Sequence, residues 1–234
     1  MSTVGERERL TQQRVVAHFR DALKYRYLGN LKDREGNSNI EEALLADWLK
    51  HQGHSKQIID KVLYELDKAK AVSGSKTLYD ANREVYGLLR YGVKVRPDVG
   101  EQHITVWLID WEHPKKNDFA IAEEVTIAGE SNKRPDIVLY VNGIALGVLE
   151  LKRSIVSVSE GIRQNLDNQK KVFIRPFFAT VQLVMAGNET EGLRYGVIET
   201  PEKYYLRWKE AGAGETPLLA ELSGICRKDR LLEI

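Results

Sequence analysis

The stretch Arg134–Lys152, RPDIVLYVNGIALGVLELK, decides the fold of this 234-residue chain. It contains two apolar runs on either side of Asn142-Gly143, a dipeptide typical of tight β-hairpin turns. Three charged residues interrupt the apolar pattern: Asp136, Glu150 and Lys152. Burying a carboxylate in an apolar sheet is costly unless the carboxylate is paired or binds a metal ion. The three charges therefore predict a functional site on a hairpin.

The geometry of strands sets a condition on this site. Glu150 and Lys152 are two residues apart, so their side chains leave the same face of the strand. A simple two-residue turn at Asn142-Gly143 would point Asp136 away from Glu150. A three-residue loop with Gly143 in the left-handed conformation would place all three charges on one face. We therefore predict the three-residue loop or an equivalent bulge.

Two carboxylates beside a lysine suit metal-dependent hydrolysis of a phosphodiester. Asp136 and Glu150 offer the hard oxygen ligands that Mg²⁺ prefers, and Mn²⁺ is a possible substitute. Lys152 would position or help deprotonate the attacking water, while the metal stabilises the charge that develops on the phosphate. The alternative interpretation is an ordinary hairpin with salt-bridging charges near its ends.

The rest of the chain predicts an α/β fold in which a mixed central sheet is flanked by helices. Apolar residues at helical spacing predict helices near 15–23, 40–51, 55–66 and 79–89, with a loop over 29–38. Strands are predicted over 104–109, 119–127, 136–141, 145–151, 181–186 and 193–198, and a helix over 157–172. We expect a helical N-terminal region over 1–91, a core over 92–209, and over 210–234 a linker followed by the start of another domain.

Composition bounds the classes of function. A net charge of +1 means that any nucleic-acid surface must be a local patch. The one cysteine, Cys226, excludes a disulfide within the chain and suits a reducing compartment. No signal peptide or membrane-spanning stretch is evident in the sequence, so we expect a cytoplasmic protein.

The hairpin motif resembles the PD-(D/E)-x-K nucleases. Together with 117–122, 133–139, 149–152 and 183–188, it resembles the N-terminal region of the type I restriction enzyme R subunit, over roughly residues 10–234. This resemblance implies a restriction-endonuclease-like core and a Mg²⁺-dependent endonuclease that cuts double-stranded DNA without local sequence specificity. Asp136 and Glu150 would hold the metal, and Lys152 would be the catalytic lysine.

The resemblance also implies further site residues. The family has a glutamine on the helix after the E-x-K strand, and Gln164 fits that position, where it would support the site or contact a DNA phosphate. The tyrosine that usually follows four residues later is Asn168 here. Related nucleases often add an acidic residue from an early helix, for which Glu41 or Glu42 is the candidate. Both acids could instead complement a helix dipole, and Gln164 could belong to a solvated polar face.

Basic residues around the motif predict a DNA-binding surface. They are Lys133, Arg134, Arg153, Arg163, Lys170 and Lys171. For Lys170 and Lys171 a solvated helix face is the alternative.

The resemblance implies methyltransferase and specificity subunits as partners. It also implies a following ATP-driven motor, so ATP is expected only in a longer form of the protein, and the chain would be a fragment or a natural short form. The alternatives are a free-standing nuclease of the same superfamily and a non-catalytic module for DNA binding or assembly. A nicking assay and knowledge of the full gene product would separate them.

Overall fold

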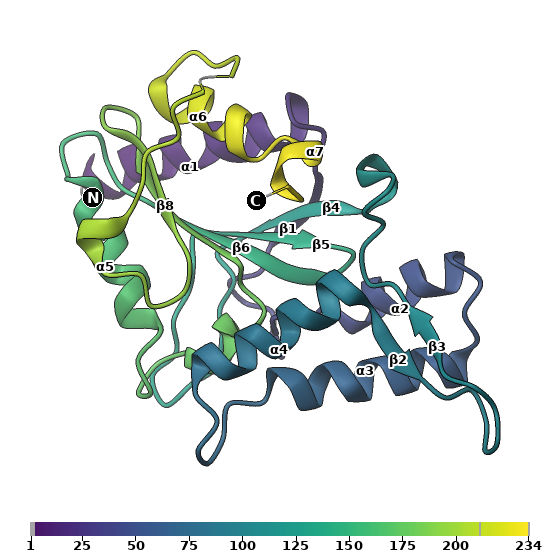
Figure 1. Ribbon diagram of the computed structural model, residues 1–234. Coiled ribbons are helices and arrows are strands. Elements are labelled where there is room, and N and C mark those ends of the chain that lie inside the picture. The colour runs from purple at the N-terminus through teal and green to yellow at the C-terminus, as the bar shows by residue number, and fades with distance from the viewer. Residues whose placement is uncertain (1–2, 211, 234) are drawn as a thin grey trace.

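The hairpin identified in the sequence lies in the middle of a six-stranded sheet (Figure 1). The structure is a computed structural model and describes residues 3–210 and 212–233. The strands are β1 (Arg26–Asn30), β4 (Phe119–Glu123), β5 (Ile137–Val141), β6 (Ile144–Leu151), β7 (Leu183–Asn188) and β8 (Gly192–Gly196), and they lie in that order across the sheet. The β1–β4 and β6–β7 pairs are parallel, whereas the other neighbours are antiparallel. The predicted mixed α/β fold is confirmed.

Helices flank this sheet. They are α1 (Thr3–Asp21), α2 (Glu42–His51), α3 (Lys56–Lys70), α4 (Leu78–Tyr91), α5 (Val158–Asn168), α6 (Pro217–Ile225) and α7 (Lys228–Leu231), with 3-10 turns η1 (Pro114–Lys116), η2 (Arg175–Ala179) and η3 (Glu202–Tyr204). Figure 1 shows α1, α6 and α7 together above the sheet and α3 beside α4 below it. Among the described residues, none of the helices combines the length and the apolar character that crossing a membrane requires.

Alternation along the strands divides the core into two layers. In β4, Ile121 packs in the cluster that contains Phe19 of α1, whereas the next residue, Ala122, lies in the opposite cluster with Phe178 of η2. Successive strand residues point to opposite faces, so the central strands bury both of their sides. Every residue of β5 and β6 is buried. This burial explains their nearly continuous apolar sequence and gives the site a rigid base.

The N-terminal region also contributes a strand, which corrects the expectation of helices followed by a loop. Arg26–Asn30 forms β1, an edge strand that pairs in parallel with β4. Its sequence, RYLGN, does not alternate apolar and polar residues, and its side chains are exposed or half-buried. The strand conformation therefore depends on hydrogen bonding to β4 more than on a local pattern. As a result, the N-terminal region belongs to the same sheet as the hairpin.

The strand predicted over 104–109 is shorter and lies outside the main sheet. β3 (Ile104–Val106) pairs with β2 (Val93–Val95) in a separate two-stranded ribbon. The strand predicted over 119–127 ends at Glu123, because Glu124 has a φ of 53°, which breaks the extended backbone. The helix predicted over 157–172 ends at Asn168. The end of β4 matters for the site, because the Glu124 amide donates to the carbonyl oxygen of Asp136 at 2.9 Å.

The segment after the predicted linker packs onto the sheet. The hydroxyl group of Thr216 accepts a hydrogen bond from the Leu219 amide and so caps α6. Leu222 and Cys226 are fully buried in the large core cluster. The Tyr25 hydroxyl donates to the carbonyl oxygen of Cys226 at 2.8 Å. The division of the chain near residue 210 stays a prediction, and the helix that follows it shares the core of the sheet.

Candidate active site

The turn between β5 and β6 differs from the predicted three-residue loop. Val141 pairs with Ile144, which leaves a two-residue turn, so the predicted loop is wrong. Asn142 and Gly143 have φ values of 51° and 82°, as a tight hairpin turn of this kind requires. A Cβ at position 143 would lie 2.7 Å from the carbonyl oxygen of Glu41, so packing as well as backbone conformation requires glycine there.

A bulge at Leu146 restores the register that the site needs. The pairing shifts by one residue on either side of Leu146, so that Ile137 lies opposite Leu149. Asp136, one residue before Ile137, therefore lies opposite Glu150 and on the same face of the sheet. The equivalent bulge, which the sequence analysis allows in place of the loop, is confirmed. It brings the two carboxylates together.

Glu150 is completely buried and is held by amide groups from α5. Gln164 donates through Nε2 to Oε2 of Glu150 at 2.7 Å, and Asn168 approaches Oε1 through Nδ2 at 3.4 Å. Burial is the main cause that raises the pKa of Glu150 well above its usual range. The charge of Asp136 raises this pKa further, while the charge of Lys152 opposes the rise. A carboxyl group perturbed in this way beside a cleft is typical of a functional site.

Lys152 and Glu150 are joined through one side chain, that of Gln164. Lys152 donates from Nζ to Oε1 of Gln164 at 2.6 Å, so the same amide that donates to Glu150 accepts from the lysine. This arrangement fixes the orientation of the Gln164 amide, because the two contacts require its oxygen and nitrogen on opposite sides. Asn168, at the position where the resembling family has tyrosine, is buried at this site. Gln164 therefore contacts both Lys152 and Glu150, and its supporting role in the site stays a prediction.

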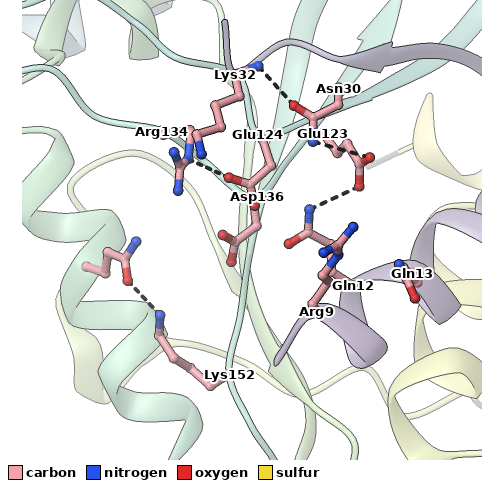
Figure 2. A pocket seen from close by; sticks show the side chains of 11 residues that line it. Arg9, Gln12, Gln13, Asn30, Lys32, Glu123, Glu124, Arg134, Asp136 and Lys152 are labelled. Atoms are coloured by element: carbon pink, nitrogen blue, oxygen red, sulfur yellow. Dashed lines mark hydrogen bonds and ion pairs between the residues drawn. The ribbon is translucent and has the colours of Figure 1, made fainter. Parts of the chain in front are cut away.

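Asp136 faces the cleft from the end of β5. Its Oδ2 accepts a hydrogen bond from the Leu151 amide at 2.7 Å. Figure 2 shows its carboxylate pointing into the cleft between Lys152 on one side and Gln12 of α1 on the other. The cleft has a volume of about 670 Å³. Its lining residues are Arg9, Gln12, Gln13, Asn30, Lys32, Glu123, Glu124, Arg134, Asp136, Lys152 and Gln164.

The carboxylates of Asp136 and Glu150 fit a divalent cation. They are oxygen donors that lie close together, and the charge of Asp136 disfavours ionisation of the buried Glu150 unless a cation offsets it. Within the described part of the chain, no group of three or more acidic, histidine or cysteine side chains could hold a metal ion. Two carboxylates leave most of the coordination sphere to water and substrate, which suits Mg²⁺ better than a metal that needs a full set of protein ligands.

Glu41 and Glu42 do not reach this site. The Glu41 amide donates to the carbonyl oxygen of Gly143 at 2.7 Å, which places Glu41 at the turn of the hairpin. Glu150 lies six residues along β6 from Ile144, about 20 Å away in an extended strand. Glu41 forms an ion pair with Arg34, and Glu42 is an acidic residue in the first turn of α2. Their alternative role, at a helix N-terminus, agrees with this position.

The basic residues predicted to bind DNA lie in different local settings, and their role in DNA binding stays a prediction. Arg163 pairs with Glu160 and Glu202, Lys170 pairs with Asp167, and Lys133 lies 3.9 Å from the centre of the Phe173 ring. Arg153 lines a separate hollow beside Ile155, and Lys171 is exposed. Arg134 is the member of the predicted set that lines the cleft, where it pairs with Glu124 (Figure 2).

Sequence reasoning missed Glu123 and Glu124, as well as the α1 side of the cleft. Glu123 is the last residue of the buried strand β4 and Glu124 follows it, a pattern that indicates polar side chains where a strand ends. Gln12 donates to Glu123 at 3.0 Å and so joins α1 to the end of β4. No local signal marks Arg9 or Gln12, because they approach the cleft from a helix more than a hundred residues away in sequence.

Comparison with known proteins gives a consistent assignment. A sequence model of the family described as "Type I restriction enzyme R protein N terminus" matches residues 5–203. The chain is 31% identical over 157 residues to the type I restriction enzyme HindI endonuclease subunit of Haemophilus influenzae, a match that covers 63% of this chain and 15% of that protein. It is 33% identical over 73 residues to the "Putative type I restriction enzyme MjaVIIIP endonuclease subunit" of Methanocaldococcus jannaschii, covering 30% of this chain and 7% of that protein.

These matches span a small part of the relatives' length, while the family match spans well over half of this chain. The family match includes both hairpin strands β5 and β6, Lys152 and α5. The predicted resemblance is confirmed, and the chain belongs to the family of type I restriction enzyme R protein N termini.

Proposed function

We propose that this chain is a Mg²⁺-dependent endonuclease domain that hydrolyses phosphodiester bonds of double-stranded DNA without reading the sequence at the cut. One observation carries the proposal: Asp136, Lys152 and Gln164 line one polar cleft, and the buried Glu150 lies behind them, bonded to Gln164. Two carboxylates and a lysine at this spacing, on a rigid sheet, are the groups that such a hydrolysis needs. Membership of the restriction R family supports the same reaction class.

The side chains divide the work of hydrolysis. Asp136 and Glu150 would hold Mg²⁺, or Mn²⁺ in its place, and the ion when bound would polarise the phosphate and favour loss of a proton from water. Lys152 would orient the attacking water and offset the negative charge that develops on the phosphate. A water oxygen forms a new bond to phosphorus, the bond to the leaving sugar oxygen breaks, and that oxygen takes up a proton.

Gln164 acts through its neighbours rather than on the substrate. Its amide holds the Lys152 Nζ and the Glu150 carboxylate in a fixed relation, because it accepts from one and donates to the other. Such supporting hydrogen bonds keep reacting groups within the narrow geometry that catalysis requires. Gln164 is therefore a positioning residue.

We propose further that the chain works as part of a larger type I restriction assembly in the cytoplasm. The relative from Haemophilus influenzae is much longer than this chain, which covers 15% of it. In the proposed assembly, methyltransferase and specificity subunits select the target, and an ATP-driven motor elsewhere in the R subunit delivers DNA to the cleft. ATP is thus proposed as a requirement of the assembly and not of the cleft itself.

A nicking assay on supercoiled plasmid tests the proposed chemistry. With Mg²⁺ the chain should convert supercoiled to nicked or linear DNA, whereas Asp136→Ala and Lys152→Ala should remove this activity. Lys50→Ala, at an exposed position in the last turn of α2, is the matched control. Equal activity in wild type, Asp136→Ala and Lys152→Ala would show that the assigned residues do not carry the reaction.

Metal binding gives a second readout that does not depend on cleavage. The melting temperature of the wild-type chain should rise with Mg²⁺ or Mn²⁺ concentration, because a ligand that binds the folded state stabilises it by mass action. Asp136→Ala and Glu150→Ala should lose this rise, and Lys50→Ala should keep it. A rise that persists in both acidic-residue variants would place the metal elsewhere.

A further inference from the structure

The side of the cleft opposite Lys152 carries two basic side chains, Arg9 of α1 and Lys32 directly after β1. Both residues are exposed to solvent. In Figure 2, Arg9 lies across the cleft from Lys152, and Lys32 extends along the rim near Arg134. The two residues come from segments that the hairpin motif does not include, and the fold places them around Asp136.

These two cations lack an acidic partner in the described part of the chain. The other basic groups of the cleft are engaged: Arg134 pairs with Glu124, and Lys152 donates to Gln164. Among the side chains that the structure describes, those of residues 9–210 and 212–233, no ion pair involves Arg9 or Lys32. Their charge is therefore available to an anion that enters the cleft.

Neutral donors hold Glu123, an acidic residue that lines the same cleft. Glu123 accepts hydrogen bonds from Tyr27 at 2.7 Å, Gln12 at 3.0 Å and Asn30 at 3.5 Å. These bonds occupy both carboxylate oxygens without using either cation. They also hold α1 against the end of β4, since Gln12 belongs to α1. The segment after β1 is held there too, because the Leu31 amide donates to the carbonyl oxygen of Glu123 at 2.8 Å. Arg9 and Lys32 therefore extend from backbone that is tied to the end of β4.

We propose that Arg9 and Lys32 bind DNA phosphates on either side of the bond to be cut, and that the DNA backbone crosses the cleft between this wall and α5. The proposal rests on the function proposed above. Arginine suits a phosphate because its planar guanidinium can donate two parallel hydrogen bonds, and lysine adds a compact charge. Arg163 on α5 and Lys170 just after it are ion-paired and offer a weaker field, so the favourable path for DNA lies on the α1 and β1 side.

The salt dependence of DNA binding tests this wall. The chain carries Asp136→Asn to prevent cleavage, and its affinity for a fluorescent duplex is measured by anisotropy over a range of NaCl concentrations with Mg²⁺ present. Each lost phosphate contact lowers the magnitude of the slope of log K against log salt by about one. Arg9→Ala and Lys32→Ala should each show this decrease, and the double variant should show about twice as much.

Matched variants separate charge from structure. Arg9→Lys should keep the parental slope, because it retains the positive charge, and Lys50→Ala should keep it because Lys50 lies on α2 away from the cleft. Unchanged slopes in Arg9→Ala and Lys32→Ala would contradict the proposal that these two residues bind DNA phosphates. A parent chain that does not bind the duplex would contradict it as well. If the slopes fall as expected while wild type fails to cut DNA with Mg²⁺, phosphate binding by Arg9 and Lys32 is supported and the proposed nuclease mechanism is wrong.

Discussion

At the scale of single residues, the side chain of Gln164 holds Lys152 and Glu150 in their arrangement through one hydrogen bond to each. Gln164→Leu removes both hydrogen bonds and leaves the lysine ammonium without its 2.6 Å acceptor. We predict a loss of about 10–100-fold in Mg²⁺-dependent cleavage or in metal affinity, the usual cost of losing a supporting contact behind a metal ligand. Rates and metal titrations on the plasmid assay measure both quantities.

The control for this prediction lies on the same helix. Arg163 is exposed and pairs with Glu202 and Glu160 on the outer side of α5. Arg163→Ala should therefore change cleavage little, because exposed ion pairs contribute little to stability and do not touch the site. Equal losses in Gln164→Leu and Arg163→Ala would contradict the positioning role.

Glu150 gives a prediction about pH. Its folded pKa is raised above the ordinary value of 4.5, so the fold favours the protonated form. The resulting contribution to stability is complete below pH 4.5 and is lost as the pH rises toward the folded pKa. Glu150→Gln stays neutral at every pH. In metal-free buffer, the free energy of unfolding of this variant minus that of wild type should therefore increase above pH 4.5, by at most about 1.4 kcal/mol per pH unit.

Urea unfolding at several pH values checks this expectation. Glu160→Gln is the matched control, since Glu160 is an exposed carboxylate on α5. The difference between the control and wild type should change little over the same range. A difference between Glu150→Gln and wild type that does not grow with pH would mean that Glu150 is ionised in the fold without penalty.

At the scale of elements, Gly161 sets the distance between α5 and the sheet. A Cβ at this position would lie 3.1 Å from the Ala186 Cβ, 3.5 Å from the Lys152 Cγ and 3.6 Å from the Glu150 Cβ. A larger residue must push α5 outward and carry Gln164 away from its partners. We predict that Gly161→Val costs about 1–3 kcal/mol of stability and removes most of the cleavage activity.

Gly87 offers the matched substitution on another helix. A Cβ there meets nothing within 4 Å, so Gly87→Val should be neutral or slightly stabilising, because valine forms helix better than glycine. Thermal unfolding and the nicking assay compare the two variants. If Gly161→Val kept full activity at a temperature where it is folded, close packing of α5 would not be what aligns the site.

At the scale of the whole molecule, α6 shares the core of the sheet. Leu222 is fully buried, and Glu221 accepts a hydrogen bond from the Leu193 amide at 2.6 Å and pairs with Arg207. Leu222→Ala should therefore lower the free energy of unfolding by about 2–5 kcal/mol, as for other buried leucines. Urea unfolding followed by circular dichroism measures the change.

The exposed Leu206 provides the control for this prediction. Its side chain is 58% exposed, so Leu206→Ala should have a small effect. If Leu222→Ala destabilised the chain as little as Leu206→Ala, the core would fold without α6. The predicted boundary near residue 210 would then mark an independent unit.

The amino-acid sequence by itself determined which residues we propose to carry the chemistry. Asp136, Glu150 and Lys152 stand out because a charge inside an apolar strand is costly without a partner or a metal, and this cost is visible in the local pattern. The alternation of apolar residues likewise determined most of the sheet, and the strand spacing placed Glu150 and Lys152 on one face.

Tertiary structure decided what lies around these residues. Asp136 joins Glu150 through a bulge at Leu146 whose position follows from pairing between strands, and the local pattern does not specify it. β1 exists because β4 offers hydrogen bonds, and Arg9 reaches the cleft because α1 packs near the end of β4. These features depend on contacts between segments far apart in sequence. The motif therefore singled out the groups that we propose to react, while only the fold placed Arg9 and Lys32 on the opposite side of the cleft.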